Sequence, residues 1–249
     1  MTQEFFHEPD TLPECVVVFG NSSAIARAMI QQLSDSGCQA VLTVGREASD
    51  SAHHCCVDLT QSESVAVLEA FLRQHREQGR IPGWYFHCSG ILHDGEHWPE
   101  KGIAAIQSDW LSRSLDVNLL THVHAAQAVD RLLSRKAPVR WASLSAMVGS
   151  IGDNRMGGWH SYRISKAALN MFVRGLDVEW RRKNVDSRVV AIHPGATESE
   201  LSRPFRRGLP VGRPFSAALT AARMIQIMAS LSEEQSGHLL HWDGHPLPF

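Results

Sequence analysis

The chain has 249 residues, 43% of them apolar, and carries a formal net charge of −2 at pH 7. A chain of this length and composition fits one α/β domain over residues 1–249 better than two small domains. The near-neutral charge gives no broad electrostatic reason to bind nucleic acid or an anionic membrane surface. We therefore expect neither partner.

Residues 1–14 form an acidic N-terminal extension that lacks the basic and apolar regions of a signal peptide. No apolar run approaches the about 20 residues that a helix needs to span a bilayer. The five cysteines show no C-x-x-C spacing and fit reduced thiols. These features favour a cytoplasmic protein.

Short β-branched and aromatic runs alternate with helix-like segments along the chain. We expect strands at residues 15–19, 40–44, 54–57, 84–88, 139–144, 188–192 and 238–242. Helical spacing occurs between Gly20 and Gly37 and at residues 63–78, 110–135, 162–183 and 214–231. This alternation predicts a doubly wound parallel sheet of about seven strands, with ligands bound beyond the carboxyl ends of the strands.

Tyr162 and Lys166 stand four residues apart in a segment that favours helix, so their side chains share one helix face. An ammonium about 4 Å from a phenolate at a partly shielded site interacts with it by roughly 4 kcal/mol. Because one pKa unit corresponds to about 1.4 kcal/mol, we expect Lys166 to lower the pKa of Tyr162. Such a tyrosine can serve as general acid and base. Taken alone, the pair is weak evidence and fits better an exposed helical pair without a role, because Tyr-x-x-x-Lys arises often by chance.

The turn from Gly20 to Ala26, with the sequence GNSSAIA, joins the first strand to the first helix. Its small residues let a ligand approach the backbone, and the N–H groups of a helix N-terminus bind anions such as a pyrophosphate. By itself the segment fits equally an ordinary tight turn capped by Ser22 or Ser23.

These motifs resemble those of the short-chain dehydrogenases/reductases, and the YRISKAALN run is similar to the C-factor-like branch of that family. Ala24 and Ala26 replace the later glycines of the family's Gly-x-x-x-Gly-x-Gly turn. The resemblance runs from about Cys15 to the C-terminus and implies a single-domain Rossmann fold that binds a nicotinamide dinucleotide. The cofactor-binding residues that it implies are Gly20, Ser22, Ser23, Ala24, Ile25, Arg46, Asp58, Leu59, Ser89, Gly90, Tyr162, Lys166, Pro194, Gly195, Thr197 and Ser199.

Arg46 follows the second strand, and Gly45 stands where dinucleotide-binding folds often place an acid for the ribose 2′-hydroxyl. An arginine fork suits a 2′-phosphate better than a hydroxyl. We therefore expect NADP(H) rather than NAD(H), with a solvated surface charge as the alternative role of Arg46.

The resemblance also assigns catalytic roles. Tyr162 is the expected general acid and base, Lys166 tunes it, and Asn118 sustains a proton relay. Ser145 is the expected hydroxyl that polarises the substrate oxygen. Ala146 occupies the place of the usual catalytic serine, so a merely structural Ser145 stays an alternative.

We expect an NADP(H)-dependent oxidoreductase of the carbonyl reductase type, which transfers a hydride between nicotinamide and a small carbonyl or alcohol substrate. The alternative is a dinucleotide-binding signalling or regulatory protein with weak or vestigial catalysis. Residues 201–212 are basic, contain Pro and Gly, and predict a substrate lid. The fourteen histidines lack the spacing of metal ligands, so we expect no metal. The family resemblance implies a homodimer or homotetramer.

Overall fold

A central sheet of eight strands, in the order β3-β2-β1-β4-β5-β6-β7-β8, organises the described residues. The computed structural model describes residues 12–135, 137–184, 186–205, 207 and 212–249. Most of the expected N-terminal extension and part of the expected lid, residues 206 and 208–211, lie outside this range. The strands are β1 (Cys15–Phe19), β2 (Ala40–Gly45), β3 (His54–Cys56), β4 (Trp84–His87), β5 (Val139–Leu144), β6 (Ser187–Ile192), β7 (Leu239–Leu240) and β8 (Pro246–Leu247).

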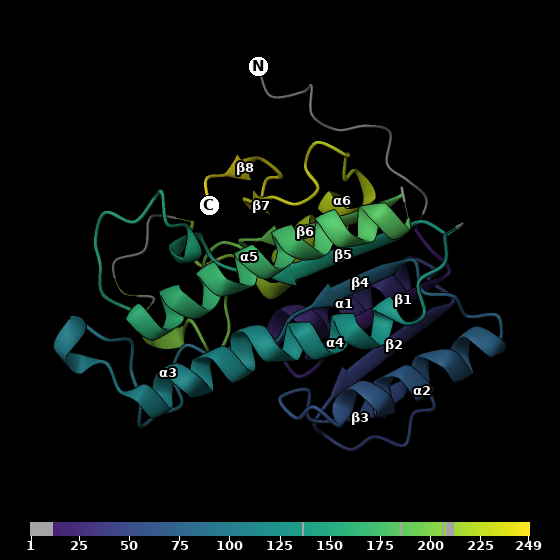
Figure 1. Cartoon of the computed structure of the whole chain (residues 1–249), viewed down its shortest axis with the longest axis horizontal. Coiled ribbons are helices and arrows are strands. Elements are labelled where there is room, and N and C mark those ends of the chain that lie inside the picture. Colours follow the sequence, from purple (N-terminus) through teal and green to yellow (C-terminus); the bar gives the residue numbers. More distant parts are fainter. Residues whose placement is uncertain (1–11, 136, 185, 206, 208–211) are drawn as a thin grey trace.

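Helices cover both faces of the sheet (Figure 1). The side that faces the viewer in Figure 1 carries α2 (Ser64–Glu77), α4 (Thr121–Asp130) and α5 (His160–Lys183), and the far side carries α1 (Ala24–Asp35) and α6 (Ala217–Ala229). A further helix, α3 (Ser108–Leu115), continues the line of α4 beyond the sheet. All strand pairs except the last are parallel. The predicted doubly wound Rossmann-type fold is confirmed.

Alternation along the strands divides the core into two layers, because successive side chains point to opposite faces of a sheet. In β1, Val17 and Phe19 pack under α2, α4 and α5, whereas Val16 and Val18 pack against α1 and α6. All four side chains are fully buried. Strands that are buried on both faces explain the continuous apolar runs from which they were predicted.

The eighth strand departs from the expected seven. Leu239 and Leu240 pair antiparallel with Leu247 and Pro246, so the chain turns back at its end and adds β8 to the sheet edge. The sequence did not predict a strand at Pro246–Leu247, because a strand of two residues is too short to show alternation.

The single helix expected at residues 110–135 is divided in the structure. A π-helical turn, Asp116–Leu120, lies between α3 and α4 and contains the buried Asn118. Such turns are rare and occur frequently at functional sites. Periodicity alone does not reveal them, because a π-turn shifts the helix face by only one residue.

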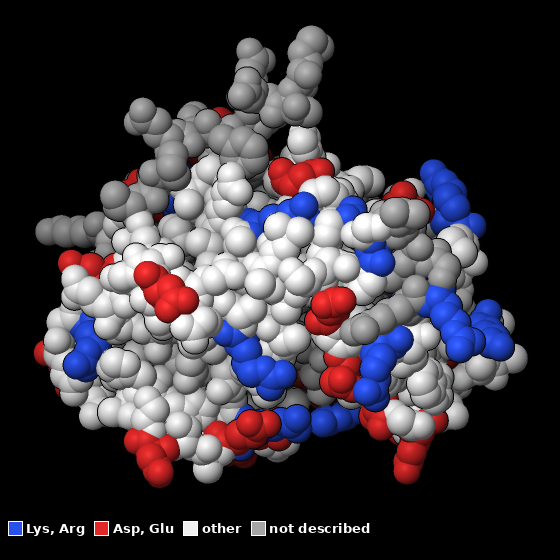
Figure 2. Space-filling view, turned by 180° about the vertical axis from the view of Figure 1, so that it is seen from behind, with Lys and Arg blue, Asp and Glu red and all other residues white. Residues whose placement is uncertain are grey.

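Charges of both signs are scattered over the surface that Figure 2 displays, with wide uncharged areas between them. No helix among the described residues is long and apolar enough to cross a membrane.

Two histidines stack in the core below the carboxyl ends of the strands. The rings of His87 and His122 lie 3.6 Å apart between centroids, and both side chains are fully buried. The His87 Nε2 donates to the Thr121 carbonyl over 3.1 Å. Burial lowers the pKa of His87 to about 3, and the nearby Lys166 acts in the same direction.

Protein stability is expected to fall on acidification because His87 is neutral in the folded state. An unfolded histidine takes up a proton below a pKa of about 6.5, so the unfolded state binds more protons between pH 6.5 and pH 3. For His87 alone the resulting loss between pH 7 and pH 5 is about 2 kcal/mol. Urea unfolding at the two pH values measures it, and His87→Phe should remove about that much of the difference. An equal loss in both proteins would contradict the assignment.

Candidate functional site

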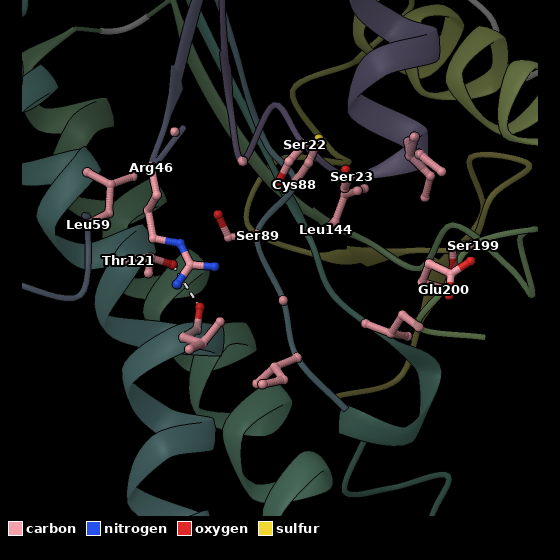
Figure 3. A pocket seen from close by; sticks show the side chains of 18 of the residues that line it. Ser22, Ser23, Arg46, Leu59, Cys88, Ser89, Thr121, Leu144, Ser199 and Glu200 are labelled. Atoms are coloured by element: carbon pink, nitrogen blue, oxygen red, sulfur yellow. Dashed lines mark hydrogen bonds between the residues drawn. The ribbon is translucent and has the colours of Figure 1, made fainter. Parts of the chain in front are cut away.

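A pocket of about 480 Å³ opens beyond the carboxyl ends of the parallel strands. Its volume lies within the range of small-molecule sites. Figure 3 shows Arg46 and Leu59 at one end, Ser199 and Glu200 at the other, and Ser22 and Ser23 between them. The lining contains most of the residues predicted from the sequence, namely Gly20, Ser22, Ser23, Ala24, Ile25, Arg46, Asp58, Leu59, Ser89, Gly90, Ser145, Tyr162, Lys166, Pro194 and Ser199.

Three predicted residues are not part of the lining. Asn118 is fully buried behind the pocket wall. Gly195 faces the rings of Phe215 and Trp242, which an added Cβ would meet at 3.0 and 2.9 Å. The Thr197 hydroxyl is buried at 2.9 Å from the hydroxyl of Thr220. Of the two hydroxyl candidates in this loop, the structure therefore favours Ser199 over Thr197 as a contact of a bound molecule.

Gly20 allows the tight turn between β1 and α1. Its φ is +71°, and a Cβ at this position would lie 2.6 Å from the Ser89 Oγ and 2.7 Å from the Ser89 N. Ser23 caps α1 by accepting a hydrogen bond from the Ala26 N over 3.1 Å. The capped turn expected as the simpler alternative is therefore present, and it also brings the N-terminus of α1 to the pocket.

Gly45 ends β2 in contact with the Asn21 side chain. A Cβ there would lie 2.0 Å from the Asn21 Oδ1, so the Asn21 side chain fills the space where an acidic side chain would begin. The next residue, Arg46, is exposed, and its guanidinium points into the pocket in Figure 3. This end of the pocket consequently presents an arginine and lacks a carboxylate at position 45.

Asp58 lies beside two arginines at the same end of the pocket. Partial burial alone would raise the pKa of its carboxyl group, but hydrogen bonds from the Thr60 N and hydroxyl hold it below its usual value. The charges of Arg46 and Arg113 contribute to the lowering. The two arginines therefore lie near the same carboxyl group, although Arg46 follows β2 and Arg113 belongs to α3.

Tyr162 and Lys166 share one face of α5 as predicted, and both line the pocket. The Lys166 Nζ lies 5.8 Å from the centroid of the Tyr162 ring and donates to the Leu144 carbonyl over 2.8 Å. Burial lowers the pKa of Lys166 to about 7.

Burial also raises the pKa of Tyr162 well above its usual value. The expectation that Lys166 lowers this pKa is therefore wrong for this arrangement. Lys166 is buried and Tyr162 is partly buried, and desolvation disfavours the phenolate and the ammonium alike.

Asn118 connects the loop after β4 to α5. Its Oδ1 accepts from the Ile91 N over 2.7 Å, and its Nδ2 donates to the Ile91 carbonyl and to the Ser165 Oγ, each over 2.9 Å. A Cβ on Gly90 would meet the Asn118 Oδ1 at 3.3 Å and the Lys166 Nζ at 3.5 Å. The buried amide thus has the partners that it requires and lies directly behind Lys166.

Ser145 lines the pocket, but its hydroxyl donates to the Asn170 Oδ1 over 2.7 Å. Its hydroxyl proton is therefore directed away from the pocket, and only an oxygen lone pair is left for a ligand. Ala146 carries no hydroxyl. Ser143, two residues earlier on β5, accepts from the Trp141 Nε1 and lies 3.0 Å from the His122 Nδ1.

Sequence reasoning missed several residues that line the pocket. Arg27 lies on α1 just after the turn, Arg113 lies on α3, and His93 and Glu200 come from loops. Arg27 could have been found from its position one turn into the helix that begins at the turn. The other three depend on how α3 and the loops fold over the strand ends, which no local pattern indicates. No group of three potential metal ligands occurs in the described part of the chain.

The dimensions and chemistry of the pocket fit a nicotinamide dinucleotide. The N-terminus of α1 suits a pyrophosphate, Arg46 and Arg113 lie at one end, and Tyr162 and Lys166 line the same cavity. In open α/β sheets, ligands bind outside the carboxyl ends of the strands where this pocket lies. The arrangement defines the class as dinucleotide-binding α/β proteins.

Comparison with known proteins identifies the family. A family model described as short chain dehydrogenase matches residues 14–209. A 1-hydroxy-2-glutathionyl-2-methyl-3-butene dehydrogenase from Rhodococcus sp. strain AD45 is 32% identical, over 92% of this chain and 96% of its own length. The chain therefore belongs to the short-chain dehydrogenase family of oxidoreductases, which confirms the resemblance inferred from the sequence.

Two further proteins share the family or the fold. The C-signal protein of Myxococcus xanthus is 27% identical over 56% of this chain and 78% of its own length. The solved structure of an NADPH-bound carbonyl reductase from chicken fatty liver has a TM-score of 0.76 and 20% sequence identity, and the match covers 96% of this chain and 100% of that chain. At 20% sequence identity, the likeness to the carbonyl reductase establishes the fold alone.

Proposed function

We propose that the protein is an NADP(H)-dependent reductase of carbonyl compounds. The observation that carries the proposal is the placement of Tyr162 and Lys166 on one face of α5 inside the same pocket that holds Arg46. A proton donor at one position and a phosphate-binding arginine at another match the two tasks of such an enzyme.

In the proposed reaction a bound reduced nicotinamide would supply a hydride to the carbonyl carbon. Tyr162 supplies a proton to the carbonyl oxygen, so that the substrate leaves as an alcohol and the dinucleotide as its oxidised form. Because burial raises the pKa of Tyr162, the phenol holds its proton at neutral pH and is ready to act as the acid. The protonated phenol carries the proton that carbonyl reduction consumes.

Lys166 and Asn118 support the tyrosine in this proposal. With a pKa of about 7, Lys166 can both hold and release a proton near neutrality, which suits a group that returns a proton to Tyr162. Asn118 holds the Ile91 backbone and Ser165 on either side of that lysine. We assign Asn118 a positioning role behind the proposed relay.

Replacement of Tyr162 by phenylalanine is expected to lower turnover by about 10²- to 10⁴-fold, because the proton donor is lost while the pocket shape is kept. NADPH oxidation with a panel of aldehydes and ketones measures turnover, and NADPH fluorescence measures binding, which should persist. Tyr85→Phe is the matched control, since Tyr85 is the other tyrosine and lies buried in β4 away from the pocket. Undiminished turnover in Tyr162→Phe would refute the acid role.

We also propose that NADP(H) is preferred over NAD(H). Gly45 carries no acidic side chain, and the Arg46 guanidinium points into the pocket. A 2′-phosphate placed near Arg46 and Arg113 would gain charge-assisted hydrogen bonds that a 2′-hydroxyl does not. A protein of the same fold that binds NADPH supports this preference.

Arg46→Gln is expected to lower kcat/KM for NADPH by about 10- to 100-fold, the equivalent of losing one charge-assisted hydrogen bond. The same parameter for NADH should change little, because NADH carries no phosphate at this position. Arg73→Gln, which alters an exposed arginine on α2 outside the pocket, serves as control. Equal losses with both dinucleotides would show that Arg46 does not distinguish them.

A second candidate function is nucleotide-dependent signalling with vestigial catalysis. It is favoured by the Ser145 hydroxyl, which donates to Asn170, and by Ala146, which leaves no second hydroxyl at this position. The C-signal protein of Myxococcus xanthus, which is 27% identical over 56% of this chain, is a second reason to consider it. Wild-type protein that binds NADPH but reduces no carbonyl compound would favour this function over the reductase.

We further propose that the protein forms a homodimer or homotetramer through α5. Three apolar side chains, Ile164, Met171 and Val178, are spaced seven residues apart along this helix and are 43%, 73% and 38% exposed. Figure 1 shows α5 on the outside of the helical layer. A second copy of the same helix could cover this stripe by a self-complementary contact.

Met171→Glu should weaken self-association at least about tenfold, because a carboxylate would be placed against an apolar contact. Sedimentation equilibrium measures the association. Val67→Glu is the matched control, since Val67 is 50% exposed on α2 and lies outside the stripe. A monomeric wild-type protein would contradict the proposed interface.

A further inference from the structure

Aromatic side chains that take no part in the proposed proton transfer form a continuous line beside the pocket. The Trp159 ring lies 6.4 Å from the Tyr162 ring and 5.1 Å from the Phe205 ring, measured between centroids. Phe205 in turn lies 5.9 Å from His93 and 6.2 Å from Trp98. Tyr162 and His93 both line the pocket, whereas Trp159, Phe205 and Trp98 lie outside its lining, so the line of rings runs along the edge of the cavity.

The backbone of Trp159 is held in an unusual conformation. Its φ is +53°, and it follows Gly157 and Gly158, whose φ values are +63° and +64°. A bulky residue with positive φ is rare, and such strain persists where surrounding contacts impose it, commonly at functional sites. Trp159 is the one non-glycine residue with positive φ among the described residues.

Glu100 supplies the contacts that hold this conformation. Its backbone carbonyl accepts from the Trp159 N over 2.6 Å. Its carboxylate is 4% exposed and accepts from the Ser161 N over 3.2 Å and from the Ser161 hydroxyl. The negative charge lies at the N-terminus of α5, where the helix dipole favours it. Glu100 thereby orients both Trp159 and the start of the helix that carries Tyr162.

The aromatic line keeps part of its surface open. Trp159, Phe205 and His93 are partly exposed, and Trp98 is 50% exposed. Aromatic rings attract other rings in offset-stacked or edge-to-face arrangements, beyond the effect of area buried. Saturated rings of the same size gain the burial but not this additional attraction.

We propose that Trp159 and Phe205 form a specificity wall that selects aldehydes and ketones whose carbonyl group carries an aromatic ring. This inference rests on the proposed reductase function and names its substrate class. The substrate ring would pack against Trp159 while its carbonyl oxygen receives the proton of Tyr162. Hydride transfer to the carbon and proton transfer to the oxygen then give an aryl alcohol.

Benzaldehyde and cyclohexanecarboxaldehyde provide the test, because the two substrates have similar size and differ in the aromaticity of the ring. The measured quantity is the ratio of their kcat/KM values, compared between wild type and variants so that intrinsic reactivity cancels. Trp159→Leu is expected to lower this ratio about 2- to 10-fold, which corresponds to the loss of one aromatic pair. Trp159→Phe should retain most of the ratio, and Phe205→Leu should lower it.

Phe249→Leu serves as the control, since Phe249 is an aromatic residue 38% exposed whose ring stacks on His238, away from the aromatic line. A thermal unfolding curve for each variant establishes that it is folded. An unchanged ratio in folded Trp159→Leu and Phe205→Leu would overturn the specificity wall and leave the reductase function standing. Failure of the wild type to reduce any carbonyl compound would overturn the reductase function, and the wall with it.

Discussion

The close contact between α5 and the end of β5 is the constraint on which the pocket depends. Gly149 lies against Lys166, and a Cβ on this glycine would be 2.8 Å from the Cβ and the carbonyl carbon of the lysine. The Lys166 Nζ reaches the Leu144 carbonyl, and the Asn170 Nδ2 donates to the Gly149 carbonyl over 3.2 Å. Because these contacts anchor the helix above the strand end, Tyr162 reaches the pocket from a rigid element.

Desolvation dominates the electrostatics of this region. Burial lowers the pKa of Lys166 to about 7 and that of His87 to about 3, and it raises the pKa of Tyr162. The attraction between an ammonium and a phenolate, which the spacing of Tyr162 and Lys166 suggested, presupposes that both groups are charged. Burial works against both charges, so Tyr162 keeps its proton while Lys166 exchanges its proton near neutral pH.

Much of the fold and of the pocket could be predicted from the sequence, because both depend on local patterns at the ends of strands. Gly20, Arg46 and Asp58 each follow a buried apolar run, and the parallel topology brings such positions to one edge of the sheet. The π-turn around Asn118 and the short β8 could not be predicted, since neither changes the apolar periodicity visibly. The position of Arg113 in the pocket and the burial of the Thr197 hydroxyl depend on contacts between residues far apart in the sequence, which local patterns do not indicate.

The contact between Asn21 and Gly45 restricts how the nucleotide preference of this protein could change during evolution. An aspartate introduced at position 45 would begin with its Cβ 2.0 Å from the amide oxygen of Asn21. An acid at this position therefore requires the Asn21 side chain to turn to another rotamer, because its amide oxygen is the contacting atom. A change of dinucleotide preference at position 45 would thus also move the buried amide oxygen of residue 21 into a new environment.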